Sequence, residues 1–496
     1  MITAAMGLYH QQVKTFFTHT ADATAHDTGF VRRTRLITGS LFLQALVWTV
    51  YKYGQITMPA LAATAEELEP QCHASEQAFQ ARFQSQAVAF LQALFAHALH
   101  AAVVPSAAVV PLLSAFSAVY LLDSTVVALP AALAASFAGC GGDASAAAVK
   151  IFLLLNWLTG SYETLELRDG RKADQDMGKP FLAGRPPGAL WLFALGFWSV
   201  EFFVALARVG SFFVSRLHSQ VTLSVYDRLG QVVPLELEPL LKRVPRQGIF
   251  EIPVLIGPKQ QVSCRLLCSP VPPAVVNARR RRAKRTAQKK GRTLSQRTLA
   301  RLSWSLFITN VAPDALPTSM IESVYRVRWQ VELAFKLAKS QAGLARRTSD
   351  KPERVLCELY AKILAWWFFA RLRQLIPETA QISWPKAWRR LTEWLHDWGR
   401  ELRQTQQTTV FTALVAYLGR RARATKKRKH PSTLRRVAQA TSTAEMRQLP
   451  DIWRYMPAGS HGRTTSRSTR GVQTNLEVPQ SIPVQEGAPP MPKAAA

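Results

Sequence analysis

The spacing of hydrophobic and polar positions divides the chain into helical and strand-rich parts. Residues 1–104 show helical periodicity. From about residue 115, short apolar and β-branched runs bounded by turn residues take over, a pattern typical of buried strands. These runs predict strands at 118–127, 149–158, 162–167, 188–196 and 211–217, with a helix at 199–209. Three adjacent strands followed by helix–strand alternation indicate a mixed α/β sheet with helices on its faces.

The second half of the chain resumes this pattern after an interruption. Residues 219–275 alternate apolar and polar positions with a period of two, which predicts a β-rich insertion. The Arg and Lys residues at 279–292 follow, and we interpret this block as a mobile, solvated linker or a surface that contacts a polyanion. The sheet pattern returns at 304–310, and a long helix is expected at 318–342, with more helices to about residue 424.

These changes of period predict a chain of six parts. They are a helical N-terminal domain (1–104), the first part of the α/β core (105–218), a β-rich insertion with its basic linker (219–300), the second part of the core (301–375), a helical C-terminal region (376–435) and a basic tail (436–496). The tail is rich in Ser, Thr, Pro and Gly, so we expect it to be disordered.

The charge of the chain narrows the choice of partner. Lys and Arg number 62 against 32 Asp and Glu, which gives a formal net charge of +30. A surplus of this size indicates a polyanionic partner, and the clustering of the basic residues favours nucleic acid. We therefore interpret the N-terminal helices as a DNA-binding domain that presents helix ends to phosphates, with a plain helical bundle as an equally supported alternative.

Two apolar stretches raise the question of a membrane protein. Prolines at 105 and 111 interrupt the stretch 101–122, and 189–200 is shorter than the roughly 20 residues that a membrane-spanning helix needs. The five cysteines are scattered, which is typical of reduced intracellular thiols and not of a disulfide framework or a zinc site. The sequence thus predicts a cytoplasmic protein without a membrane segment.

The helix expected at 318–342 has an unusual polar face. At about 100° per residue, one stripe roughly 80° wide holds Tyr325, Arg328, Glu332, Lys336 and Lys339. The opposite face holds Val327, Val331, Ala334 and Ala338. Ion pairs between residues four apart would explain the stripe as a solvated surface. They do not explain a lone carboxylate among so many cations, whereas a metal ligand beside phosphate-binding side chains does.

The spacing Tyr325-x2-Arg328-x3-Glu332-x6-Lys339 resembles the Y-R-E-K signature of the DDE transposases of insertion sequence family 4. The resemblance covers residues 25–375 and includes the order of strands and helices and the β-rich insertion. It implies an RNase H-like fold in which two Asp residues on strands and one Glu on a late helix hold two divalent metal ions, Mg²⁺ or Mn²⁺. It also implies cut-and-paste transposition on double-stranded DNA, at the inverted-repeat ends and the target, by a homodimer on DNA.

The resemblance assigns Glu332 as the third acid and Asp123, in the run LLDST, as the first. Asp123 falls in the middle of an apolar strand, where an unpaired charge is costly, so a metal ligand explains it better than a structural role. Two metal ions would activate water or a 3′-hydroxyl and stabilise the leaving oxygen. By the same resemblance, Arg328 and Lys339 contact phosphates near the cut and Tyr325 adds a hydrogen bond.

Three further residues are candidates for DNA contact. Lys336 lies on the same stripe as the signature residues. Trp304, on the strand before the helix, resembles the aromatic residue with which family members hold a flipped base, and Trp329 would assist at a hairpin. For both Trp residues, packing between the sheet and the helix is the alternative.

The second acid of the family is missing from its expected place. Residues 190–197 (LWLFALGF) fit the family pattern LxxDLGY, with Ala194 where the Asp stands. Glu201 would need an unusual geometry to replace it, and Asp174 and Asp176 fall in a loop before the strand. We expect a strongly impaired enzyme that keeps its DNA-binding surface, or a chain in which the register differs or a nearby acid compensates. A DNA-binding regulator without catalysis would have no reason to place Asp123 within a strand.

Overall fold

The computed structural model describes residues 2–33, 36–100, 111–142, 144–246, 248–257, 262–289, 291–376, 382–404, 408–424 and 437. The tail expected at 436–496 lies outside the described residues, apart from residue 437. Among the helices described, none is long and apolar enough to cross a membrane.

The first five strands form a mixed sheet in the order β3-β2-β1-β4-β5. They are β1 (Val119–Leu129), β2 (Ala147–Asn156), β3 (Ser161–Asp169), β4 (Leu190–Phe193) and β5 (Phe212–Arg216). The first three are antiparallel, β4 runs parallel to β1, and β5 runs parallel to β4. The helix α7 (Val200–Arg208) connects β4 to β5, as parallel neighbours require. This is the RNase H-like arrangement, so the predicted fold class is confirmed.

The remaining strands extend the same sheet to ten, in the order β5-β10-β9-β8-β6-β7. They are β6 (Leu223–Tyr226), β7 (Val232–Pro234), β8 (Phe250–Ile256), β9 (Val262–Pro270) and β10 (Trp304–Thr309). Because β10 pairs with β5 on one side and with β9 on the other, the β-rich insertion continues the core sheet. A short helix, α8 (Leu237–Arg243), lies between β7 and β8 in the chain.

The basic block at 279–292 differs from the mobile linker expected from its charge. Most of it belongs to the helix α9 (Pro273–Lys289), which is followed by α10 (Gln296–Arg301). Arg279 fastens α9 to the sheet, because its guanidinium donates to the Trp304 carbonyl at 3.0 Å and to Ser305 Oγ at 3.1 Å. The helical conformation thus sets the exposed cations of this block at fixed positions.

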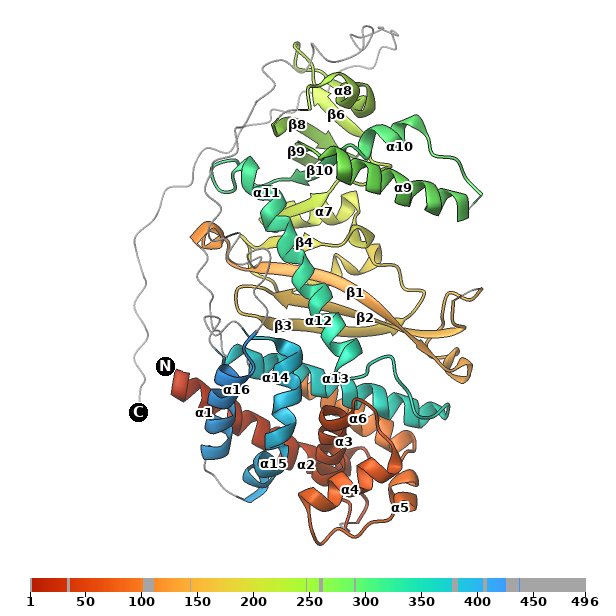
Figure 1. Cartoon of the computed structure of the whole chain (residues 1–496), viewed down its shortest axis with the longest axis vertical. Coiled ribbons are helices and arrows are strands. Elements are labelled where there is room, and N and C mark those ends of the chain that lie inside the picture. Colours follow the sequence, from red (N-terminus) through yellow and green to blue (C-terminus); the bar gives the residue numbers. More distant parts are fainter. Residues whose placement is uncertain are drawn as a thin grey trace, which may run out of the picture. The chain divides into compact units, whose positions relative to one another are not determined.

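The N-terminal and C-terminal helices pack together into one helical body (Figure 1). The N-terminal set is α1 (Ile2–Thr15), a π-helical turn (Phe16–Thr20), α2 (Ala21–Asp27), α3 (Gly39–Tyr53), α4 (Met58–Leu68), α5 (Glu76–Gln80) and α6 (Ser85–His100). The C-terminal set is α13 (Pro352–Gln374), α14 (Trp384–Leu391), α15 (Leu395–Gln404) and α16 (Thr409–Arg421).

Buried hydrogen bonds join the two sets of helices. Tyr9 donates to the carbonyl of Phe368 at 3.0 Å, Tyr51 to that of Ala365 at 2.8 Å, and Trp48 Nε1 to that of Leu395 at 2.7 Å. The N-terminal helices therefore complete their core with side chains and carbonyls from the end of the chain.

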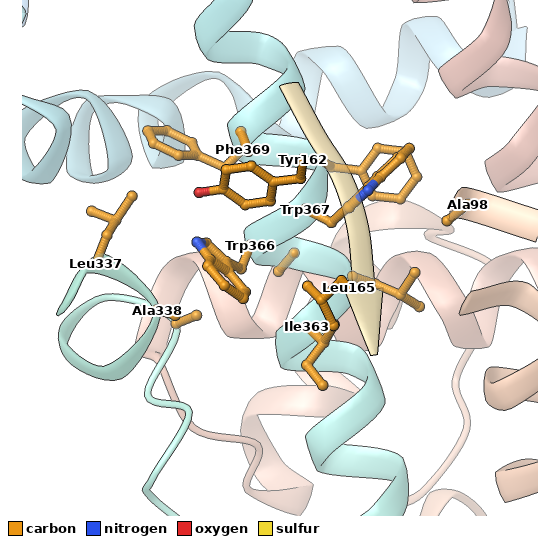
Figure 2. Close-up of a cluster of buried hydrophobic side chains, with 14 of the residues drawn as sticks. Ala98, Tyr162, Leu165, Leu337, Ala338, Ile363, Trp366, Trp367 and Phe369 are labelled. Atoms are coloured by element: carbon orange, nitrogen blue, oxygen red, sulfur yellow. The ribbon is translucent and has the colours of Figure 1, made fainter. Parts of the chain in front are cut away.

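The helix α13 connects this helical body to the sheet. It is buried on nearly all sides, and Figure 2 shows its residues between the strand β3 and the helix that carries Leu337 and Ala338. Trp366 packs edge-on against Tyr162 of β3, with ring centroids 5.1 Å apart, and lies 5.7 Å from the ring of Phe335. The sheet and the segment Tyr325–Lys339, which carries the signature residues and is called the signature helix below, thus share one core with α13.

The helix expected at 318–342 is divided. It consists of α11 (Thr318–Tyr325), a 3-10 turn (Arg326–Arg328) and α12 (Trp329–Ser340), which cross the sheet in Figure 1. The prediction of one continuous helix was therefore wrong at this turn, although its two-faced pattern was right. Val327, Val331 and Ala338 are fully buried and Ala334 nearly so.

Candidate active site

Asp123 lies in the middle of β1, between β2 on one side and β4 on the other. Its side chain is largely buried, and its Oδ1 accepts a hydrogen bond from the backbone N–H of Ser124 at 2.9 Å. Burial raises the pKa of the Asp123 carboxyl to about 6, and the charges of Glu332 and Asp174 act in the same direction. The Ser124 hydrogen bond and Arg328 lower that pKa, so the carboxylate depends on nearby positive charge.

Arg328 joins the two predicted acids. Its Nη1 donates to Asp123 Oδ2 at 2.9 Å, and its Nη2 donates to Glu332 Oε1. The guanidinium can bridge them because Arg328 ends the 3-10 turn and Glu332 lies one helical turn further on, facing β1. The two carboxylates therefore lie on the same face of the sheet and share one counter-ion.

The two carboxylates line an open hollow of about 520 Å³ together with Lys336 and Lys339. Lys339 Nζ also donates to the carbonyl of Val126, further along β1, at 3.4 Å. The hollow thus combines carboxylate oxygens with two ammonium groups on the same helix face, as expected for the stripe.

Tyr325 lies at the end of α11 and is 8% exposed. Its hydroxyl donates to the carbonyl of Phe193, the last residue of β4, at 3.3 Å, and the Arg328 guanidinium carbon lies 5.8 Å from the centre of its ring. Burial raises the pKa of Tyr325. In this structure the phenol is a buried link between the signature helix and β4.

Ala194 directly follows β4 and is adjacent to Asp123. In the parallel register Leu122 pairs with Phe193, so the next residues along the two strands are Asp123 and Ala194. The backbone N–H of Ala194 donates to the carbonyl of Leu122 at 3.3 Å. Ala194, which stands where the family pattern has its second Asp, therefore lies next to Asp123. Glu201 is not a substitute here, because it is 69% exposed and pairs with Lys179 at 2.6 Å.

Sequence reasoning gave little weight to Asp174, which the structure places against Ser124, on the face of β1 opposite to Asp123. Its Oδ1 accepts from Ser124 Oγ at 2.7 Å and lies 2.7 Å from Lys150 Nζ. Asp174 comes from the loop after β3, so only the folded path of that loop brings it to β1. No local pattern around it distinguishes it from the other loop acids.

The two Trp candidates differ sharply in exposure. Trp304 is 3% exposed and packs edge-on against Phe250, with ring centroids 5.4 Å apart. It has the core packing that was the alternative to base stacking. Trp329, at the start of α12, is 54% exposed. Of the two rings, that of Trp329 is the more exposed to solvent.

A large open groove of about 1470 Å³ lies between the insertion and the helices α9 and α10. Basic side chains outnumber acidic ones along it. They include Arg216, Lys242, Arg279, Arg282, Arg292, Arg297, Arg301 and Arg326. Because Tyr325 also lines the groove, its basic wall begins beside the signature helix.

The oxygen donors of the site suit a hard cation. Among the described residues, no group of three or more His, Cys, Asp or Glu side chains is assembled as a metal site. Mg²⁺, however, commonly binds through one or two carboxylates and completes its shell with waters and substrate phosphates. Asp123 and Glu332, which share a counter-ion and a hollow, fit that mode of binding.

Comparisons with known proteins agree with the signature. Residues 114–368 match the family described as transposase DDE domain. The transposase for insertion sequence element IS231B of Bacillus thuringiensis is 26% identical over 360 residues, covering 69% of this chain and 74% of the relative. The transposase for IS1151 of Clostridium perfringens is 25% identical over 355 residues, covering 69% and 75%.

Among solved structures, a piggyBac transposase synaptic complex with hairpin DNA covers 84% of this chain and 85% of that chain, with 11% identity and a TM-score of 0.43. The segment that matches the DDE domain family, residues 114–368, begins before β1 and ends within α13, so it contains both carboxylates and the signature helix. The chain therefore belongs to the DDE transposases of insertion sequences, within insertion sequence family 4.

Proposed function

We propose that this transposase binds the terminal repeats of its element and cuts and joins DNA at the site of Asp123 and Glu332. The observation that carries the proposal is that these two carboxylates, from distant parts of the chain, share Arg328 and line one hollow with two lysines. A solvated helix face would not require Asp123 to be buried opposite it within a strand. The substrate is double-stranded DNA at the inverted repeats and the target.

Asp123 and Glu332 would hold Mg²⁺ or Mn²⁺, which supplies an activated water or 3′-hydroxyl and stabilises the leaving oxygen. Lys336 and Lys339 lie where they can hold phosphate oxygens beside the carboxylates. Arg328 can do the same, because its guanidinium lies between the two carboxylates and suits bidentate contact with phosphate. Tyr325 positions this end of the helix through its hydrogen bond to β4.

The DNA itself would lie along basic surfaces that flank the site. The groove beside α9 and α10 and the cations of α9 are suited to the phosphate backbone, which proteins contact mainly through Arg and Lys. Trp329 is exposed at the start of α12 and can stack on a base. The N-terminal helices would bind the terminal repeats, and two protomers would pair the two ends.

Ala194 makes catalysis slow in this proposal. It leaves the site without the strand carboxylate that stands beside Asp123 in the family pattern. Each 1.36 kcal/mol of lost transition-state stabilisation lowers the rate about tenfold, so a missing metal ligand would cost orders of magnitude. A second candidate function follows from the same residue, namely a transposase that only binds DNA.

The test is Mg²⁺- or Mn²⁺-dependent cleavage of the element's end DNA by three proteins: the unaltered chain, Ala194→Asp, and Ala194→Asp with Glu332→Ala. We expect Ala194→Asp to cut at least tenfold faster than the unaltered chain, and the double variant to be inactive. If all three bind the ends and none cuts, the chain only binds DNA. Cutting that survives Glu332→Ala would refute the assignment of the site.

A further inference from the structure

The hairpin formed by β6 and β7 ends in apolar side chains that face solvent. Leu229, in its turn, is 83% exposed, the highest value among the exposed large hydrophobic side chains of the described residues. Tyr226 and Val232 flank the turn, pair with one another across the two strands, and are 57% and 43% exposed. Single exposed apolar residues are common on protein surfaces, but three within one hairpin indicate a surface that makes a contact.

The turn that carries Leu229 is held in one conformation by hydrogen bonds. The Asp227 carboxylate accepts the backbone N–H groups of Leu229 and Gln231, both at 2.8 Å, and the Asp227 N–H donates to the Gln231 carbonyl at 2.8 Å. Gly230 has a φ of 76°, in the left-handed region that favours glycine. Because the turn is already ordered, little conformational entropy is lost when Leu229 is buried against a partner.

The hairpin begins at the basic groove beside α9 and α10. Leu223 at the start of β6 and Pro234 at the end of β7 both line this groove. The strand β8 pairs with β6 at Leu223 and Ser224, whereas β7 pairs with β6 as far as Tyr226. The described pairing thus leaves the outer part of the hairpin outside the body of the sheet. At about 3.3 Å per residue, Leu229 lies within about 20 Å of the groove.

The charge around the hairpin favours DNA over a second copy of this chain as the partner. Basic side chains predominate along the groove and the net charge is +30, so two copies would repel one another here, whereas a polyanion is attracted. The edge strand β7 spans three residues and ends in Pro234, which has no N–H to donate. It is therefore a poor edge for pairing with a strand of another copy.

We propose that Leu229 is a wedge that inserts between two base pairs of double-stranded DNA lying along the basic groove. The inference rests on the proposed function, because it assumes that this groove holds the DNA. Apolar side chains of architectural proteins enter a duplex from the minor groove, and the partial unstacking of the base step bends the duplex by about 20–90°. Such a bend would bring more of the phosphate backbone against the cations of α9.

The test uses the full-length chain and the variants Leu229→Ser, Leu229→Met and Val209→Ser. Because Leu229 is exposed, its substitution should leave the fold intact, which thermal unfolding followed by circular dichroism checks. Leu229→Met keeps an apolar side chain of similar size. Val209→Ser is the matched control, because Val209 is an aliphatic residue that is 44% exposed and lies at the end of α7, outside the groove.

The probe is a duplex of the element's end with a donor and an acceptor fluorophore at its two termini, so that bending raises the energy transfer. In a second set of duplexes, 2-aminopurine replaces adenine at successive positions, and its fluorescence rises where a base step is unstacked. We expect the unaltered chain, Leu229→Met and Val209→Ser to give both signals. We expect Leu229→Ser to lose both signals and to bind the duplex about tenfold or more weakly.

The dependence of the affinity on salt concentration separates a wedge from a phosphate contact. Leu229→Ser should leave the slope of log affinity against log salt concentration unchanged, because it removes no contact that releases counter-ions. Arg282→Gln with Arg297→Gln, which removes two cations of the groove, should reduce the slope by about 2. An unchanged slope in this double variant would mean that the duplex lies elsewhere and would overturn the inference.

The remaining outcomes distinguish the inference from the proposed function. Absence of bending by the unaltered chain, or both signals retained in Leu229→Ser, would overturn the wedge and leave the proposed function intact. A change of Leu229→Ser from dimer to monomer without DNA, measured by light scattering, would make the tip a contact between copies and would also overturn the wedge. Failure of every protein to bind the end duplex would overturn the proposed function and the inference together.

Discussion

Arg328 neutralises two partly buried carboxylates at once, so its removal should be costly to stability. In Arg328→Met, the charges of Asp123 and Glu332 would face one another without their shared counter-ion. Breaking a fully buried ion pair by removing one partner costs about 3–5 kcal/mol. Because this cluster opens into the hollow and water can reach Glu332, we expect the lower end, about 3 kcal/mol.

The same substitution should be far cheaper once the carboxylates carry no charge. In Asp123→Asn with Glu332→Gln, the guanidinium has no charge to neutralise, and Arg328→Met should cost less than about 1 kcal/mol. The difference between the two backgrounds, about 2 kcal/mol, is the coupling energy of the cluster. It is measured by urea unfolding of the full-length chain in EDTA, followed by circular dichroism.

A matched control separates charge from packing. Arg326→Met removes an exposed guanidinium from the same turn, where it pairs with Glu322, and should change stability by less than about 0.5 kcal/mol. Equal costs of Arg328→Met in the two backgrounds would refute the reasoning. They would mean that Arg328 contributes through its packing against the ring of Tyr325.

Three further predictions concern stability and DNA contact. Burial lowers the pKa of His10 from 6.5 to about 4, so the unfolded chain binds a proton at this residue more readily than the folded chain. The contribution of His10 to the free energy of unfolding is therefore fully present above pH 6.5, and about 3 kcal/mol of it is lost by pH 4. Urea midpoints of His10→Gln should lack this loss. Gly343 has a positive φ of 62° and a β-carbon there would overlap the carbonyl of Gly54, so Gly343→Ala should cost about 2 kcal/mol or more in thermal unfolding. Trp304→Ala should cost about 3–5 kcal/mol, whereas Trp329→Ala should leave stability unchanged and weaken binding of end DNA in a mobility-shift assay.

The sequence predicted those features whose signal is local. The strand β1 is an apolar run broken by one charge, and both its position and its charge could be identified from residues 118–127. The spacing of the signature residues depends only on helical geometry, and the buried face at Val327 and Val331 follows from it. That Ala194 lies next to Asp123 could be predicted because the runs LLDST and LWLFALGF match two motifs whose strands are neighbours in the RNase H-like fold.

Features that depend on distant pairing could not be predicted in this way. Asp174 contacts Ser124 and Lys150 only because the loop after β3 folds back over β1 and β2, and no periodicity records that path. The continuation of the sheet into the insertion depends on β10 pairing with both β5 and β9. In the basic block, charge suggested a linker, but the Arg279 hydrogen bonds to β10 favour a helix.

The shared core of the first and last helices has a consequence for synthesis of the protein. The helix α3 ends at Tyr53, but α13, which receives its Tyr51 hydroxyl, begins about 300 residues later, so at 5–20 residues per second the ribosome needs about 15–60 s to supply it. During that time the apolar faces of the first helices lack their final partners. A nascent chain in this state is prone to aggregation and should depend on chaperones, and a prematurely terminated product should be degraded instead of competing for DNA.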